Sequence, residues 1–151
     1  MNHKIFKLMF NLYPPYWATG IVVKNVTPDF REVIVEMKMR FYNRNYMYTH
    51  FGGSLYAMTD PFYMVMLIQI LGNEYVVWDK AAYINFIKPG RGTVTAKFTI
   101  DQVLLTDISK NTADGQKYIR DLTVDVKDEQ DETVARVVKT LYIRKNIPGK
   151  S

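Results

Sequence analysis

The apolar segment 54–71 (SLYAMTDPFYMVMLIQIL) restricts most strongly what this chain can fold into. It is apolar on nearly every side of a helix, and Gly72 and Asn73 follow it as helix-stopping residues. A helix of this kind must be covered on most of its faces. Its most apolar part, residues 61–68, is bounded by polar side chains and is too short to span a bilayer. The segment therefore predicts one long helix at the centre of the molecule.

The chain is strand-like on both sides of this helix, with hairpin-sized connections. A parallel α/β fold would need a crossover helix between successive strands, and after residue 73 no segment is long enough for one. Residues 101–116 predict a single helical turn and a loop, and a second long helix within 100–145 would contradict this arrangement. We expect an α+β fold, an antiparallel sheet of about six strands wrapped around one central helix. The expected strands lie within residues 21–30, 31–42, 75–87, 93–100, 117–127 and 133–144.

The N-terminal residues 1–18 predict a short amphipathic helix, which we interpret as a lid or packing helix. Two prolines, Pro14 and Pro15, must end it. No repeat or linker divides the chain, so we expect a single domain over residues 1–151 with a flexible tail at 146–151. The apolar positions of the helix are Ile5, Phe6, Leu8, Met9 and Leu12.

Composition excludes several kinds of site. The chain has no cysteine, which rules out disulfides, Cys-ligated zinc, iron–sulfur clusters and thiolate nucleophiles. The N-terminus lacks the apolar core and cleavage positions of a secretory signal, so we expect a cytoplasmic protein without a membrane span. The net charge of +5 comes from cations spread along the chain. Such a charge suits an anionic small ligand at least as well as nucleic acid, and we expect no nucleic-acid partner.

The run from His50 to Asp60 (HFGGSLYAMTD) carries the chemical signal. It resembles the signature of hotdog-fold acyl-CoA thioesterases of the phenylacetate-pathway type, in which a glycine pair opens the central helix and an acid lies seven positions further on. Gly53 and Asp60 keep that spacing. The Asn-rich segment before the turn and the stretch INFIKPG at 84–90 are also similar. The longer run THFGGSLYAMTDPFY has a still stronger resemblance to an uncharacterised branch described as tetrameric acyl-CoA thioesterases.

The resemblance implies a hotdog fold and hydrolysis of an acyl-CoA or acyl-carrier thioester, with coenzyme A as part of the substrate and no other cofactor or metal. Thioester hydrolysis needs oxyanion donors and a carboxylate that attacks or activates water. Amides near Gly52 and Gly53 at a helix start would be the donors, and Asp60 would be the carboxylate. His50 would orient the carbonyl or a water. Because Asp60 lies nearly two helical turns beyond Ser54, we expect a homodimer or tetramer that shares the site.

Asp60 also has a purely structural interpretation. Asp-Pro is a strong helix-opening dipeptide, with Asp60 as the N-cap of a helix over 61–71 and Pro61 at its first position. If the helix instead begins at Ser54, Pro61 must kink it or free the Ala57 carbonyl, at a cost of up to about 3 kcal/mol.

The remaining candidates are assigned to substrate binding. Asn43, Asn45 and Ser54 lie on either side of the glycine pair, although Asn43 and Asn45 are most simply turn residues. The resemblance places Lys88 and Arg91 near the nucleotide phosphates of coenzyme A. A group of aromatic and methionine side chains is expected in the core, and part of it would line an acyl channel. This group is Met58, Phe62, Tyr63, Met64 and Met66.

Two other functions stay open at this point. His50 with Asp60 could supply the acid–base pair of a hotdog hydratase or dehydratase acting on thioesters. A non-catalytic acyl-binding module would keep the pocket without the chemistry.

Overall fold

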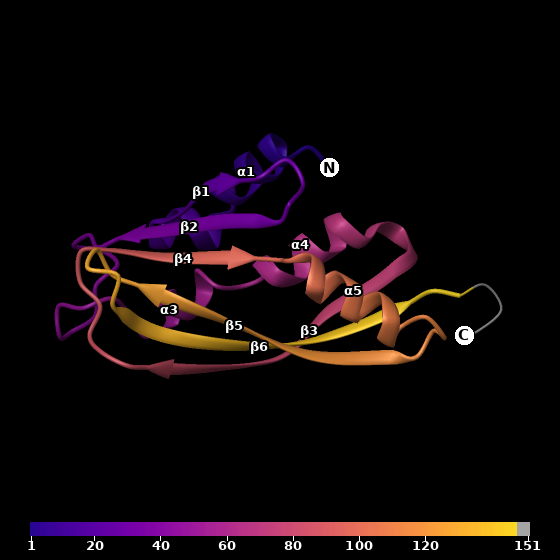
Figure 1. The fold of residues 1–151 in the computed structure, drawn as a ribbon. Coiled ribbons are helices and arrows are strands. Elements are labelled where there is room, and N and C mark those ends of the chain that lie inside the picture. The colour runs from indigo at the N-terminus through magenta and orange to yellow at the C-terminus, as the bar shows by residue number, and fades with distance from the viewer. Residues whose placement is uncertain (148–151) are drawn as a thin grey trace.

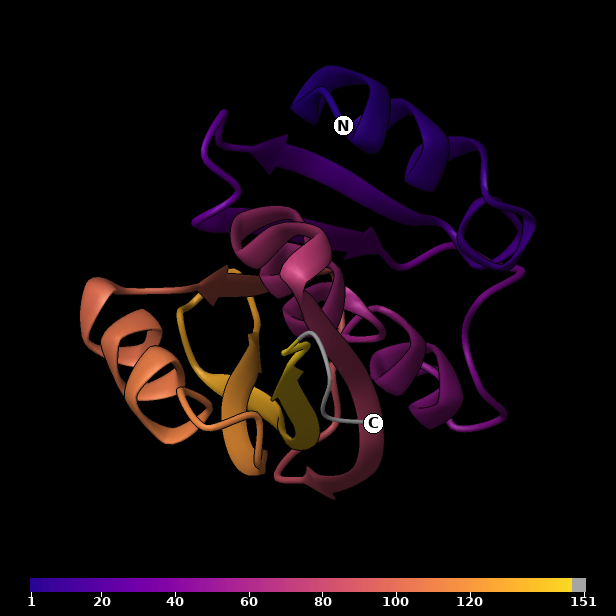
Figure 2. The ribbon, with the colours of Figure 1, turned by 90° about the vertical axis from the view of Figure 1, so that its right-hand side faces the viewer.

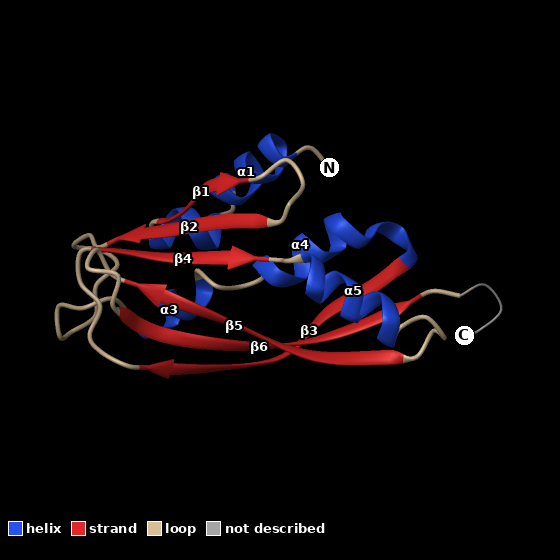
Figure 3. Ribbon diagram, in the orientation of Figure 1, coloured by secondary structure: helices blue, strands red, loops and turns tan. Residues whose placement is uncertain are grey.

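A six-stranded antiparallel sheet forms the body of the protein (Figures 1 and 3). The computed structural model describes residues 1–147. The strands lie side by side in the order β1-β2-β4-β5-β6-β3, so β1 and β3 form the two edges. This confirms the expected fold class, including the antiparallel pairing of every neighbouring pair. The strands are β1 (Ile21–Val26), β2 (Glu32–Lys38), β3 (Tyr75–Phe86), β4 (Thr93–Thr99), β5 (Lys117–Lys127) and β6 (Thr133–Lys145).

Alternation of polar and apolar residues determines which face of each strand is buried. In β2, Val33, Val35 and Met37 are completely buried, and the residues between them are partly exposed. The pairing of β4 with β5 is much shorter than the others and joins only Thr95 to Lys127 and Ala96 to Val126. The sheet is therefore open between these two strands beyond that point.

The central helical segment is broken, contrary to the single helix expected over 54–71. It consists of α3 (Gly52–Ala57), a turn, α4 (Phe62–Leu71) and the 3-10 turn η1 (Gly72–Glu74). The peptide bond between Asp60 and Pro61 is cis. Length and composition alone would allow Gly52–Glu74 to cross a membrane, a test that core helices of soluble proteins also pass. Here Phe62, Met66 and Leu67 are completely buried under the sheet.

Two helices, rather than one, occupy the N-terminus. The first, α1 (His3–Leu12), ends before the prolines as expected, and α2 (Pro14–Thr19) then begins with a proline at its first position. Asn11 bonds both the amide and the carbonyl of Val23, so α1 lies against the edge strand β1 (Figure 2). Of the apolar positions that predicted this helix, only Phe6 is buried, while Leu8 and Leu12 are exposed.

A third finding corrects the sequence analysis. Residues 102–111 form α5 (Gln102–Asn111), a ten-residue helix where a single turn was expected. The side chain of Asp101 caps it by accepting a hydrogen bond from the Leu104 amide. The helix forms the connection between β4 and β5, and one of its faces packs on the core, where Ile108 is completely buried. A second long helix in this range was expected to contradict the fold, and that expectation is wrong, because α5 lies within the connection from β4 to β5 and displaces none of the six strands.

The expected C-terminal tail is partly anchored. The Asn146 amide donates a hydrogen bond to the Glu74 carbonyl at 2.7 Å. Residues 148–151 of the predicted tail lie outside the described residues.

Candidate functional site

Asp60 lies in the turn between α3 and α4 and takes part in a buried ionic cluster. Its Oδ1 is 2.5 Å from the Lys139 Nζ, and the Asp79 Oδ2 is 3.3 Å from the same nitrogen. The Tyr16 hydroxyl donates a hydrogen bond to the Asp60 carbonyl. Burial and the nearby charge of Asp60 raise the pKa of the Tyr16 hydroxyl, so it remains a donor. Helix α2, strand β3 and strand β6 thus converge on this turn.

Lys139 is the residue that sequence reasoning missed. Only 1% of it is exposed, and its ammonium also lies 5.4 Å from the centre of the Tyr56 ring. Burial lowers the pKa of Lys139, but the hydrogen bond and charge of Asp60 and the charge of Asp79 outweigh burial and raise it overall. The sequence does carry a signal for its burial. Residues two apart on a strand share a face, and Val137 and Leu141 on either side of Lys139 are buried.

Asp79 lies on β3 beside an irregularity in the register between Asp79 and Ala81. Burial raises its pKa, and the neighbouring Lys139 opposes that rise. The Asp79 Oδ1 is buried and has no hydrogen-bond partner among residues 1–147. One buried cation therefore compensates two carboxylates, of which Asp60 is the more exposed: 44% of its side chain is accessible, against 20% for Asp79.

A cavity of about 420 Å³ opens beside Asp60. Its walls come from the N-terminal helices and from the turn that carries the carboxylate, and most of them are apolar or aromatic. Met58, Phe62, Tyr63 and Met66 are buried core residues, as expected, and none of them lines this cavity. The lining residues are Met9, Phe10, Tyr13, Pro15, Tyr16, Ala57, Asp60 and Pro61.

The N-cap interpretation of Asp60 is wrong. The residue flanking α4 at its N-terminus is Pro61, and no side chain caps that helix. The Asp60 carboxylate is bound to Lys139 instead.

His50 is buried away from this cluster. Its Nε2 is 3.0 Å from the Gly92 carbonyl, which can only accept, so the ring donates from Nε2. The Nδ1 atom is buried without a partner in the described part of the chain. Burial lowers the pKa of His50, partly opposed by the bond to Gly92. His50 ties the loop before α3 to residues 90–92 and does not line the Asp60 cavity.

The glycine pair permits close packing at the start of α3. A Cβ on Gly52 would lie 2.9 Å from the Phe86 ring, and a Cβ on Gly53 would meet the Phe51 ring. Ser54 is buried, and its amide donates to the Phe51 carbonyl. The amides of Gly52 and Gly53 donate no hydrogen bond to any residue in the range 1–147.

The two asparagines organise loops. Asn43 is 6% exposed; its Oδ1 accepts from the Arg40 amide, and its Nδ2 donates to the carbonyls of Thr19 and Lys38. Asn45 bonds the backbone and side chain of Thr49.

The two basic residues assigned to coenzyme A differ in their surroundings. Lys88 forms ion pairs with Asp128 and Glu132, whereas Arg91 is exposed. Their contact with coenzyme A stays a prediction.

Comparisons with known proteins identify the class as a hotdog-like fold. A protein of unknown function from Pseudomonas aeruginosa, described as a probable thioesterase, superposes with a TM-score of 0.82 at 15% identity, over 97% of both chains. A thioesterase from Haemophilus influenzae gives a TM-score of 0.70 at 13% identity, covering 100% of this chain and 96% of that one. The PaaI protein of the E. coli phenylacetic acid degradation operon gives 0.59 at 16% identity, covering 93% and 89%.

The family is shown by sequence. Residues 2–143 match the family described as "Domain of unknown function (DUF4442)", and the chain belongs to it. No curated protein matches the chain.

Replacing Lys139 by Met tests the ionic cluster. We expect a loss of about 3 kcal/mol in the free energy of unfolding, because Asp79 is left buried without a counter-ion and Asp60 remains partly hydrated. Adding Asp79→Asn should restore part of the loss, measured by urea denaturation of both variants. Asp79→Asn is also measured in the wild-type background. If it lowered the free energy of unfolding by the same amount in the wild type and in Lys139→Met, Lys139 and Asp79 would not be coupled.

His50 gives a stability prediction with a definite sign. Since burial lowers its folded pKa below the ordinary value of 6.5, the unfolded chain binds a proton first as the pH falls through that value. Stability from this residue is therefore complete above about pH 6.5 and is lost on acidification toward the folded pKa. His50→Gln, which keeps a donor for the Gly92 carbonyl, should reduce the fall in melting temperature between about pH 7 and pH 5. His3→Gln is the matched control. If His50→Gln lost as much melting temperature on acidification as the wild type, the loss would come from carboxylates and not from His50.

Proposed function

We propose that this protein hydrolyses an acyl-CoA thioester to the free acid and thiol. The observation that carries the proposal is the Asp60 carboxylate, which is accessible at a mostly apolar cavity while a buried lysine holds it in place. Binding sites for acyl groups need such apolar walls with few, well-placed polar groups. The cavity is of ordinary size for a small-molecule site.

The chemistry needs only water as a second reactant. Asp60 either removes a proton from a water that attacks the thioester carbon, or attacks that carbon itself and forms an anhydride that water then cleaves. In both routes the C–S bond breaks, the thiolate leaves and takes up a proton, and the acid is released. Lys139 keeps the carboxylate oriented through its bond to Oδ1. Lys139 is thus a positioning residue, since it does not line the cavity.

The oxyanion would be stabilised by backbone amides. Those of Gly52 and Gly53 are candidates because they donate to no residue within 1–147. They do not line the Asp60 cavity of the same chain, which lies at the other end of α3. A second copy of the chain would provide donors from the other side.

The free edge strand β3 supports such a second copy. Ala82 and Phe86 share the inner face of the sheet with Lys139 and the core, yet both are exposed, Phe86 by 55%. Ala82 is also the register partner of Lys139, so the ionic cluster lies one strand in from the open edge. A long edge strand with exposed apolar residues is a template for pairing with another chain. We propose a homodimer formed through β3, which could assemble further into a tetramer.

Structural neighbours agree with this choice of reaction. The similar proteins from Pseudomonas aeruginosa and Haemophilus influenzae are described as a probable thioesterase and a thioesterase. Together with the Gly53-to-Asp60 spacing, likeness to PaaI supports a place in the phenylacetate-type branch. The hydratase alternative is less well supported, because His50 is 3% exposed and does not reach the cavity at Asp60.

Asp60→Asn tests the reaction. The amide oxygen can still accept from Lys139, but the basicity and negative charge are lost, so turnover should fall by about a hundredfold or more. Thiol release from a panel of acyl-CoAs measures this, with double-bond absorbance recorded in parallel for a hydratase. Asp131→Asn, another change of a salt-bridged carboxylate, is the matched control and should keep full activity. Full activity in Asp60→Asn at unchanged stability would remove Asp60 from the mechanism.

Ala82→Arg tests the shared edge. A bulky cation on the inner face of β3 should weaken self-association by at least about tenfold, because a buried unpaired charge is costly. Sedimentation velocity at micromolar concentration measures the effect, and Val103→Arg on the exposed side of α5 is the control. A wild-type chain that remains monomeric would contradict the shared site.

A further inference from the structure

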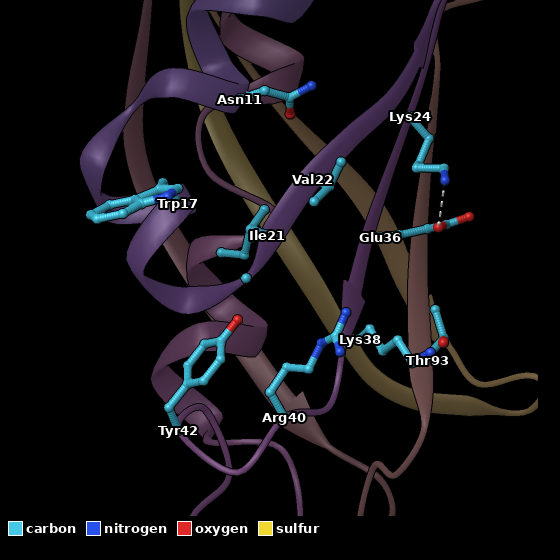
Figure 4. A pocket seen from close by; sticks show the side chains of 11 residues that line it. Asn11, Trp17, Ile21, Val22, Lys24, Glu36, Lys38, Arg40, Tyr42 and Thr93 are labelled. Carbon is cyan, nitrogen blue, oxygen red and sulfur yellow. Dashed lines mark ion pairs between the residues drawn. The ribbon is translucent and has the colours of Figure 1, made fainter.

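A second pocket, of about 410 Å³, lies on the other side of α2 (Figure 4). We call it the basic-aromatic pocket. Trp17 stands on its helix side, Tyr42 and Arg40 come from the segment after β2, and Lys24, Glu36 and Lys38 come from the strands. No part of the proposed reaction uses it. The residues that line it are Asn11, Trp17, Gly20, Ile21, Val22, Lys24, Glu36, Lys38, Arg40, Tyr42 and Thr93.

The charge of this pocket is positive and only partly compensated. It contains three cations and one carboxylate, and that carboxylate, Glu36, is paired with Lys24 at 3.5 Å. The side chains of Lys38 and Arg40 are exposed and have no acidic partner among residues 1–147. Two free cations at one pocket attract an anion with more than one charge, and a guanidinium suits phosphate in particular.

Two aromatic side chains accompany these cations. Trp17 is 74% exposed and Tyr42 is 54% exposed. Exposed aromatic rings beside free cations are the combination that binds nucleotides, because the base stacks on a ring while the phosphates meet the charges. If Lys38 and Arg40 served only as hydrated surface charges, the exposed rings of Trp17 and Tyr42 beside them would have no role.

The walls of the pocket are fixed by buried interactions. Asn43 donates to the carbonyls of Thr19 and Lys38 and accepts from the Arg40 amide, which joins the end of α2 to the end of β2. Gly20 has a φ of +76°, and a Cβ there would lie 3.0 Å from the Asn43 Nδ2. The backbone that carries Trp17 is therefore fixed relative to the backbone that carries Lys38 and Arg40, as a preorganised ligand site requires.

We propose that the basic-aromatic pocket binds a nucleoside phosphate, with the base at Trp17 or Tyr42 and the phosphates at Lys38 and Arg40. Two kinds of ligand carry such a group, a free nucleotide and the nucleotide end of coenzyme A. The second source rests on the proposed thioesterase function. Helix α2 would then separate the two ends of one substrate, with Tyr16 on the side of Asp60 and Trp17 on the side of the nucleotide. Binding itself needs no reaction.

The experiment is equilibrium binding to the full chain, measured by calorimetry. The ligands are ADP, coenzyme A, pantetheine and inorganic pyrophosphate. The variants are Lys38→Glu/Arg40→Glu and Trp17→Ala. Arg91→Glu tests the other predicted position of the phosphates, and the exposed Lys117→Glu and Leu12→Ala are the matched controls. Melting temperatures of all variants exclude a folding fault.

We expect ADP to bind and pantetheine not to bind. The charge reversal should weaken ADP binding by about tenfold or more, and Trp17→Ala should weaken ADP by about tenfold while leaving pyrophosphate unchanged. Affinity should also fall as salt rises from about 50 to about 200 mM. Coenzyme A that binds at least as well as ADP identifies the coenzyme as the source, and a strong preference for ADP identifies a free nucleotide.

Three results would overturn the proposal: no binding of either nucleotide to the wild-type chain, unchanged affinity in the pocket variants, or a loss confined to Arg91→Glu. Hydrolysis of a short thioester without a nucleotide, S-acyl-N-acetylcysteamine, is measured on the same preparation. A chain that hydrolyses it but binds no nucleotide keeps the proposed function and loses only this pocket. A chain that binds nucleotide but hydrolyses nothing shows the reverse.

Discussion

The placement of one ammonium group in the core determines how the site is built. Lys139 is almost completely buried, and a buried charge is tolerated only when it is paired. Its two carboxylates come from β3 and from the turn between the central helices. The cluster therefore links the sheet to the helical layer at the place where the helical segment is interrupted, and it gives Asp60 a defined position in a turn that has no helical capping to hold it.

Much of the fold could be predicted because polar–apolar alternation marks strands, and helix-stopping residues mark helix ends, within a few residues of sequence. The six strands follow from period-two patterns, and the buried helical segment follows from an apolar run that ends at Gly72. The errors occur where a single local rule was given too little weight. Asp101 is an N-cap for α5, and Leu104 and Ile108 repeat at helical spacing, yet the segment was assigned only one turn. Pro61 left two interpretations open, a kinked helix from Ser54 or a separate helix over 61–71, and the chain forms two helices around a turn.

The site could be predicted only in part, since its members come from distant strands. The spacing from Gly53 pointed to Asp60, but spacing along one helix carries no information about β6 or β3. Its parity with Val137 and Leu141 marks Lys139 as inward-facing, although a lysine in a strand is ordinarily assumed to face water. Its pairing with Asp60 and Asp79 becomes visible only in the folded structure. Asn43, most simply interpreted from the sequence as a turn residue, does organise the backbone of Thr19, Lys38 and Arg40, and its contact with a substrate stays a prediction.

The short pairing between β4 and β5 divides the sheet into two halves. Strands β1, β2 and β4 form one, and β5, β6 and β3 form the other, with the Tyr63 hydroxyl donating to the Thr123 carbonyl across the opening. Lys139 and Asp79 belong to the second half, whereas Lys38 and Arg40 extend from the first. Only two residue pairs join β4 to β5, so the placement of one half against the other contributes to the distance from Asp60 and Lys139 to Lys38 and Arg40. That distance limits the length of a molecule that can reach both sites.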